Sequence, residues 1–152
     1  MKLKPLLSPT RIALQVSLSS KKKSLQAVSE LFAKDIPSIS KDLVFDALTD
    51  REKLGTTGLG DGIAIPHCRY ADCCEPLCAI ITLTDGGVSF DASDGKNVDL
   101  LWALIVPTDA NDDHLQTLAL MAEKLTQTEI CQAIRQAQDP AKLYLLLTDD
   151  SH

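Results

Sequence analysis

Residues 98–106 have the sequence VDLLWALIV, and Pro107 follows them directly. Every position in this run is apolar except Asp99. A strand that is apolar at successive positions has both faces buried, which is typical of the middle of an α/β sheet. The run therefore predicts a central strand that is covered by helices on both sides and ended by the proline.

Shorter segments on both sides of this run predict further strands. Residues 12–18 place apolar side chains at every second position, and residues 77–83 form another apolar run. Ile63–Ile65 is a short apolar segment before a proline, and the turn at 85–87 leads into residues 88–90. Together with the central run, these segments predict a sheet of about five strands.

Serine and aspartate residues mark the starts of several predicted helices. Ser19 or Ser20 precedes a helix with an apolar face, and Ser40 precedes another. The last third predicts helices over 111–125, over about 128–137 and after Asp139-Pro140. We expect an α/β fold in which residues 1–152 form a single domain, a sandwich whose central mixed sheet has helices on both faces.

Composition narrows the class of protein. With 15 Lys plus Arg against 21 Asp plus Glu, the net charge is −6, which argues against binding to nucleic acid or to an anionic membrane surface. No apolar run approaches the roughly 20 residues of a membrane span, and the N-terminus lacks the pattern of a signal peptide. We therefore expect a cytoplasmic protein, in which Lys21, Lys22 and Lys23 form a solvated basic patch.

The cysteines do not suggest a disulfide framework or a metal site. Their number is odd, and Cys68, Cys73, Cys74 and Cys78 crowd into one short stretch. The sequence has no C-x-x-C pair and no Cys/His pair at helical spacing, which a zinc site would use. We expect free thiols and no bound metal.

His67 is the most distinctive polar residue. It follows Pro66 directly, after a stretch that is rich in glycine between Leu54 and Gly62. That stretch matches neither a dinucleotide-binding fingerprint nor a phosphate-binding P-loop, because the spacing and the following elements differ. The adjacent Cys68 is expected to point the opposite way on an extended chain. A histidine in this position can be reactive or structural, and the pattern alone leaves both possibilities open.

Residues 51–67, REKLGTTGLGDGIAIPH, resemble the signature of the fructose/mannitol-type (type 2) IIA domains of the bacterial phosphotransferase system. Among them, the chain is most similar to the stand-alone nitrogen regulatory members. The similarity continues through residues 90–92, residues 98–107 and His114-Leu115, so it covers nearly the whole chain.

The resemblance implies a set of site residues. His67 would be the phosphoryl acceptor, as a phosphohistidine on Nε2, with Arg51 and His114 beside it as further catalytic groups. On a helix, His114 shares a row with Leu118 and Met121, so it could reach the phosphoryl group or hold His67. The alternative for His114 is a residue at a helix start with no role in the site. The resemblance also implies three residues that position the phosphoryl group: Thr56, Thr57 and Gly58. Many members of the family have serine at the position of Thr56.

The resemblance also implies partners. The donor would be a histidine-phosphorylated carrier protein similar to HPr, and no cofactor is needed. Regulatory targets of the family include a sensor kinase and potassium-transport regulators. We expect regulation through the phosphorylation state, and the alternative is a sugar-specific IIA component that passes phosphate to a separate IIB. A third possibility is a binding module in which His67 takes no phosphate. A redox role for Cys68, Cys73 and Cys74 is left open.

Overall fold

The computed structural model describes residues 3–109 and 112–149, without the side chains of residues 112–115. A short 3-10 helix, Pro9–Arg11, leads into β1 (Ile12–Val16), α1 (Lys21–Asp35) and α2 (Lys41–Leu54). Five strands follow: β2 (Gly58–Gly60), β3 (Ile63–Ala64), β4 (His67–Tyr70), β5 (Leu77–Leu83) and β6 (Leu100–Pro107). The chain continues with α3 (Asp112–Lys124), α4 (Thr128–Gln136) and α5 (Pro140–Thr148).

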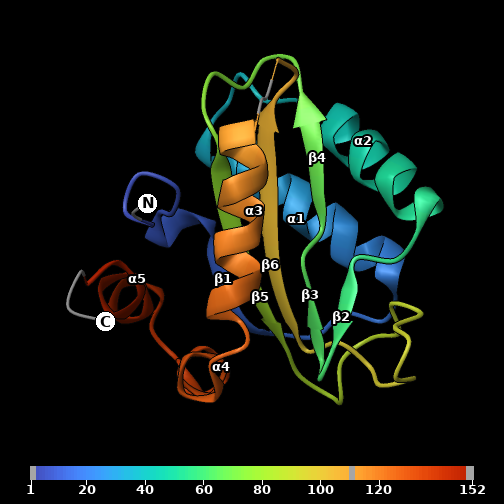
Figure 1. Ribbon diagram of the computed structural model, residues 1–152, viewed down its shortest axis with the longest axis vertical. Helices are drawn as coiled ribbons and strands as arrows, with labels where there is room; N and C mark the ends of the chain where they lie inside the picture. The colour runs from blue at the N-terminus through green and yellow to red at the C-terminus, as the bar shows by residue number, and fades with distance from the viewer. Residues whose placement is uncertain (1–2, 110–111, 150–152) are drawn as a thin grey trace.

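The predicted mixed sheet with helices on both faces is confirmed (Figure 1). The described strands form a six-stranded sheet in the order β1-β5-β6-β3-β2, and β4 also pairs with β6. β5 runs antiparallel to β6, whereas β3 and β4 both run parallel to it. β6 therefore lies at the centre, as the apolar sequence of residues 98–106 predicts.

Side chains of β6 alternate between two hydrophobic cores, one on each face of the sheet. Leu101, Ala103 and Ile105 pack on the face covered by α1 and α2. On the opposite face, Trp102 and Leu104 pack in a core to which α3, α4 and α5 contribute. Trp102 and Ile105 have no exposed surface, so the strand is covered on both sides.

The predicted helix starts are also found. The hydroxyl of Ser20 accepts from the backbone N–H of Lys23 at 3.1 Å, and that of Ser40 accepts from Leu43 at 3.2 Å. The Asp139 carboxylate accepts from the backbone N–H of Ala141 at 2.9 Å. These bonds satisfy N–H groups that have no partner within the first turn of a helix.

One strand, β4, was not predicted from the sequence. The short strand predicted before Pro66 is β3, which ends at Ala64, and β4 begins at His67 and continues along β6. Pro66 lacks an N–H group, but its carbonyl oxygen accepts from the backbone N–H of Leu104 at 2.9 Å. The proline thus interrupts the edge of the sheet without ending its pairing with β6.

Two smaller differences concern the other predicted strands. β1 ends at Val16 and not at residue 18, and Gln15 has φ +56° where the register against β5 shifts. Residues 88–90 form no strand, although Val88 makes a single antiparallel bridge with Val98.

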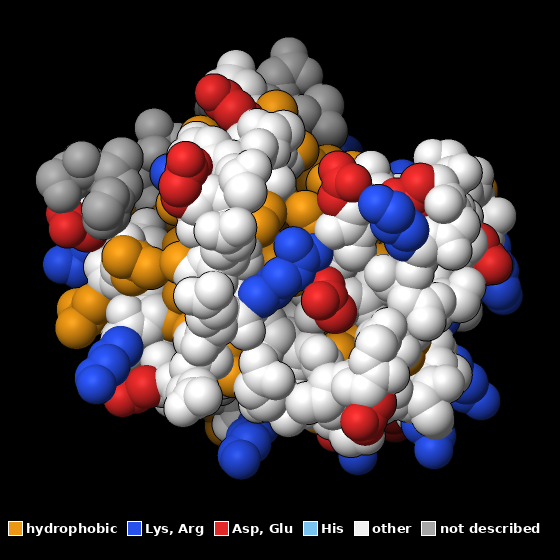
Figure 2. All heavy atoms as spheres, turned by 90° about the horizontal axis from the view of Figure 1, so that it is seen from below, with side chains coloured by type: hydrophobic (Ala, Val, Ile, Leu, Met, Phe, Trp, Pro, Cys, Tyr) orange, Lys and Arg blue, Asp and Glu red, His pale blue; other side chains and the backbone are white. Residues whose placement is uncertain are grey.

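Figure 2 shows acidic and basic side chains interspersed over the face seen from below. No helix among the described residues is long and apolar enough to span a membrane.

Candidate functional site

His67 lies where the chain passes from β3 to β4, and its side chain is half-buried. In the register of the sheet, His67 pairs with Leu104, and the following Cys68 pairs with Ile105. Leu104 belongs to the core beneath α3, whereas Ile105 and Cys68 belong to the core beneath α1 and α2. The imidazole is therefore on the α3 side of the sheet, and the neighbouring thiol is on the other side, as expected.

One ring nitrogen of His67 is already bonded to the backbone. Nδ1 lies 2.8 Å from the carbonyl oxygen of Ile65. Because a carbonyl oxygen can only accept, Nδ1 carries the proton in this bond. The neutral ring then has its lone pair on Nε2, and that nitrogen is the one available to attack an electrophile.

The surroundings of His67 lower its pKa below the ordinary value. Burial is the largest cause, and the positive charge of Arg51 lowers the pKa further. The Ile65 carbonyl and the negative charge of Glu52 raise it in part. The net effect favours the neutral imidazole, which is the nucleophilic form, near neutral pH.

Arg51 lies in the last turn of α2, at the start of the glycine-rich stretch. Its guanidinium donates from Nη1 to the carbonyl oxygen of Gly55 at 2.9 Å. Its positive charge is one of the causes that lower the pKa of His67. A guanidinium is a cation with a planar set of donors, which suits the binding of phosphoryl oxygens.

The predicted positioning residues hold the loop together. The Thr56 hydroxyl donates to the carbonyl oxygen of Phe90 and accepts from the backbone N–H of Gly58 at 3.0 Å. A Cβ atom at Gly58 would lie 3.1 Å from Cβ of Ala92, so this glycine permits close packing against residues 90–92. The Thr57 hydroxyl donates to Glu52. Both hydroxyl protons are used within the protein, which makes these threonines part of the loop's framework.

Glu52 and Lys21 are residues that sequence reasoning missed. The Glu52 side chain is only 6% exposed, and the Nζ atom of Lys21 lies 2.7 Å from its Oε2. Lys21 also lies over the ring of Phe90, 5.1 Å from its centroid. The prediction of a solvated patch is therefore wrong for Lys21. Glu52 stands inside the quoted motif, but nothing in the sequence pairs it with a lysine from another helix.

The side chain of His114 lies outside the described residues, so its predicted approach to His67 stays a prediction. The backbone of His114 belongs to the first turn of α3. Met121 of α3 and Leu125, directly after the helix, pack in the same core as Leu104. The helix therefore lies on the side of the sheet toward which the His67 ring is directed.

The cysteines are free, and most of their thiols are buried. Burial raises the pKa of Cys68 to about 12 and also raises the pKa of Cys73. Because the thiolate is the reactive form, these shifts disfavour oxidation of either thiol near neutral pH. Within the described part of the chain, no three His, Cys, Asp or Glu residues are grouped so that they could hold a metal ion.

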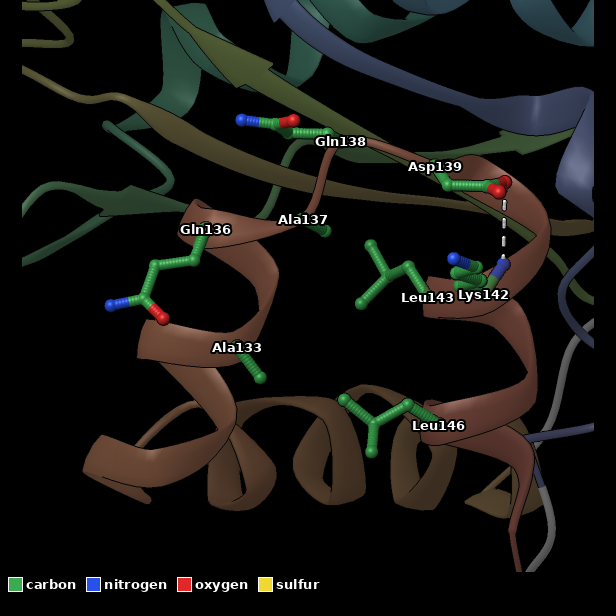
Figure 3. Close-up of a pocket in the computed structure, with 8 residues that line it drawn as sticks. All are labelled: Ala133, Gln136, Ala137, Gln138, Asp139, Lys142, Leu143 and Leu146. Atoms are coloured by element: carbon green, nitrogen blue, oxygen red, sulfur yellow. Dashed lines mark hydrogen bonds between the residues drawn. The ribbon is translucent and has the colours of Figure 1, made fainter.

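A pocket of about 370 Å³ between α4 and α5 is a second place where a functional site could lie (Figure 3). Its walls combine aliphatic side chains such as Leu143 and Leu146 with the amides of Gln136 and Gln138. Its carboxylate, Asp139, is occupied in capping α5. No histidine or cysteine is among the described residues that line it, so the chemistry is better sought at His67.

Comparison with known proteins identifies relatives of the whole chain. Residues 5–150 match the family model described as "Phosphoenolpyruvate-dependent sugar phosphotransferase system, EIIA 2". A nitrogen regulatory protein of Pseudomonas aeruginosa is 40% identical over 148 residues, covering 97% of this chain and 96% of the relative. Another, from Escherichia coli K12, is 42% identical over 135 residues, covering 89% and 82% of the two chains.

Solved structures agree with this result. The crystal structure of nitrogen regulatory protein IIA-Ntr from Neisseria meningitidis superposes with a TM-score of 0.87 at 36% identity, covering 96% of this chain and 99% of that one. IIA mannitol from Escherichia coli shares the fold, with a TM-score of 0.71 at 21% identity over 91% and 98% of the two chains. The resemblance of residues 51–67 is thus confirmed along the chain, which belongs to the EIIA 2 family of the phosphotransferase system and is similar to its nitrogen regulatory proteins.

Proposed function

We propose that His67 accepts a phosphoryl group on Nε2 from a histidine-phosphorylated carrier protein similar to HPr. Membership of the EIIA 2 family implies phosphoryl transfer and a phosphocarrier or regulatory role. The observation that carries the finer proposal is the bond between His67 Nδ1 and the Ile65 carbonyl at 2.8 Å. This bond keeps the proton on Nδ1 and leaves Nε2 as the nucleophile.

The transfer step needs no cofactor. The Nε2 lone pair of His67 forms a bond to phosphorus while the bond from phosphorus to the donor histidine breaks, and its electron pair returns to the donor ring. The His67 ring gains positive charge as the bond forms, and the Ile65 carbonyl stabilises that charge at the Nδ1 proton. We assign to Arg51 the stabilisation of charge on the phosphoryl oxygens. His114 keeps its proposed role as a second donor at the start of α3.

We further propose that the phosphorylation state of the chain regulates target proteins. The support is the identity of 40% with a nitrogen regulatory protein, against 21% with IIA mannitol. The whole chain would act as one domain, because Leu3 and Leu7 share a core with Leu143 and Leu147 of α5. The alternative is transfer onward to a separate IIB in sugar uptake.

Phosphorelay reconstitution tests the proposal. The purified chain is incubated with phosphoenolpyruvate, the first enzyme of the system and an HPr-like protein, and the labelled residue is located by mass spectrometry under alkaline conditions. Label on His67 supports the proposal, and a well-folded chain that takes no label from any donor contradicts it. Adding candidate IIB proteins to the labelled chain separates the two roles, because onward transfer to one of them favours sugar uptake.

A further inference from the structure

The carboxylate of Glu52 has hydrogen-bond donors at both of its oxygens. Lys21 Nζ lies 2.7 Å from Oε2, and the backbone N–H of Thr57 donates to Oε1 at 3.2 Å. The Thr57 hydroxyl donates to the same oxygen. A carboxylate that is 6% exposed is costly to bury without such partners, so its position has to be maintained by them.

Hydrogen bonds continue from this carboxylate to the imidazole of His67. Thr57 is itself buried, and its carbonyl oxygen accepts from the backbone N–H of Ile65 at 3.0 Å. The carbonyl oxygen of Ile65 in turn accepts from Nδ1 of His67 at 2.8 Å. An unbroken series of polar contacts thus leads from Lys21 through Glu52, Thr57 and Ile65 to the ring.

We propose that Glu52 is a positioning residue for the His67 imidazole, acting through Thr57 and Ile65, with Lys21 as its counter-charge. The inference rests on the proposed function, in which His67 is the phosphoryl acceptor. Glu52 fixes the backbone of Thr57, and the hydrogen bond from the N–H of Ile65 to the Thr57 carbonyl fixes the position of Ile65 beside it. The Ile65 carbonyl then holds the ring with Nε2 free.

The arrangement joins three parts of the fold that meet near the site. Lys21 opens α1, Glu52 lies in the last turn of α2, and Thr57 belongs to the loop before β2. Lys21 also lies over Phe90, whose carbonyl accepts from Thr56 in the same loop. A group held in this way loses little freedom when the donor arrives, which is the physical basis of preorganised catalysis.

Nuclear magnetic resonance of the His67 ring tests the proposal without any donor protein. In the wild type above the pKa of His67, we expect ¹⁵N shifts of a protonated Nδ1 and an unprotonated Nε2. Glu52→Gln keeps the shape of the side chain but removes the charge that binds Lys21. We expect intermediate ¹⁵N shifts, indicating a mixture of tautomers, and a lower pKa of His67. Asp50→Asn, an exposed carboxylate on the same helix, is the matched control and should change neither.

Single-turnover transfer from the phosphorylated donor provides the functional measurement. With Glu52→Gln, we expect the rate at saturating donor to fall by about 10- to 100-fold, as for a misplaced reacting group, while the donor concentration for half-saturation stays unchanged. Lys21→Met should act in the same direction, and Lys22→Met, at the exposed neighbouring position, should have the wild-type rate. If Glu52→Gln fails to fold, Lys21→Met carries the same measurements.

Wild-type ring shifts and a wild-type rate in folded Glu52→Gln would overturn the proposal. A slower rate with unchanged ring shifts would overturn it too, because Glu52 would then act by another route. Absence of label on wild-type His67 would instead contradict the proposed function, and the ring shifts would still decide whether Glu52 orients the imidazole.

Discussion

The Nδ1 atom of His67 lies 2.8 Å from the carbonyl oxygen of Ile65, two residues earlier in the chain. Pro66 stands between them, so the backbone that carries the acceptor oxygen is restricted in φ next to the histidine. A short and stiff connection of this kind fixes which nitrogen carries the proton. The two nitrogens of the ring are therefore already distinguished before any partner binds.

Replacing the histidine tests the acceptor directly. His67→Ala should fold normally, because the side chain is half-buried and loses one hydrogen bond, worth about 1 kcal/mol. It should take no phosphate from the donor, as measured by phosphate-affinity electrophoresis. Thermal unfolding of the same sample provides the control for folding. Full labelling of the folded variant would show that the acceptor is another residue.

The arginine should matter for its shape as well as its charge. Arg51→Lys keeps the positive charge but loses the planar set of donors, so phosphotransfer should slow by about 10- to 100-fold. Single-turnover kinetics measure this rate, and Lys53→Gln, at an exposed position two residues later, should leave it unchanged. A wild-type rate for Arg51→Lys would place the guanidinium outside the reaction.

The lowered pKa of His67 predicts how transfer depends on pH. The neutral ring is the acceptor, so labelling should be lost as the pH falls through the pKa of His67, which lies below 6.5. Arg51→Gln removes a charge that lowers this pKa, so the pKa of His67 should be higher in the variant than in the wild type. The pKa of each protein is measured from the proton resonances of the His67 ring as the pH is varied. A shift to lower pH would contradict the assigned interaction.

The same shift affects stability. Because the unfolded histidine binds its proton at a higher pH than the folded one, the free energy of unfolding should fall as the pH drops below about 6.5. That part of the pH dependence should be absent in His67→Ala, as thermal unfolding at a series of pH values would show.

His114 is tested by a pair of substitutions. If the first turn of α3 supplies a donor to the phosphoryl group, His114→Ala should slow transfer or shorten the lifetime of the phosphohistidine. His114→Gln should recover part of the loss, because it keeps a neutral donor. Neither should alter folding, since the apolar side chains of α3 such as Met121 are untouched. Altered stability with normal transfer would indicate a structural role instead.

Two adjacent glycines allow a matched test of packing in the turn after β5. Gly87 has φ +76°, and a Cβ atom there would overlap the carbonyl oxygen of Val98. Gly86 has φ +82° with open space around it. Gly87→Ala should therefore destabilise the fold by more than about 2 kcal/mol, and Gly86→Ala by only about 1 kcal/mol. Equal losses in urea unfolding would mean that the turn moves to accommodate the methyl group.

Local patterns were sufficient to predict most of the fold. The apolar run of residues 98–106 indicated the central strand, and Ser20 and Ser40 indicated helix starts, because these signals depend on neighbours in the sequence. β4 was missed because a proline usually ends a strand, and the pairing of its carbonyl with Leu104 depends on a strand far along the chain. The alternation at β1 likewise did not reveal the left-handed Gln15.

In the site, too, the sequence predicted residues that lie close together along the chain but not those that only packing brings together. Arg51 and the loop of residues 55–58 lie in one quoted motif with His67, so the resemblance indicated them together. Lys21 could not be assigned in this way, because its partner Glu52 lies on a different helix and only packing brings the two together. Charges of opposite sign are common in any sequence, and their spacing does not show which of them meet.

Trp102 is the only tryptophan of the chain, and it is fully buried in the core beneath α3, two residues before the partner of His67 in β6. The protein thus carries a single tryptophan close to the strand on which the acceptor is paired. Excited apart from the two tyrosines, its emission reports the burial of that one core, so unfolding of the core beneath α3 can be followed in the unlabelled chain by fluorescence alone.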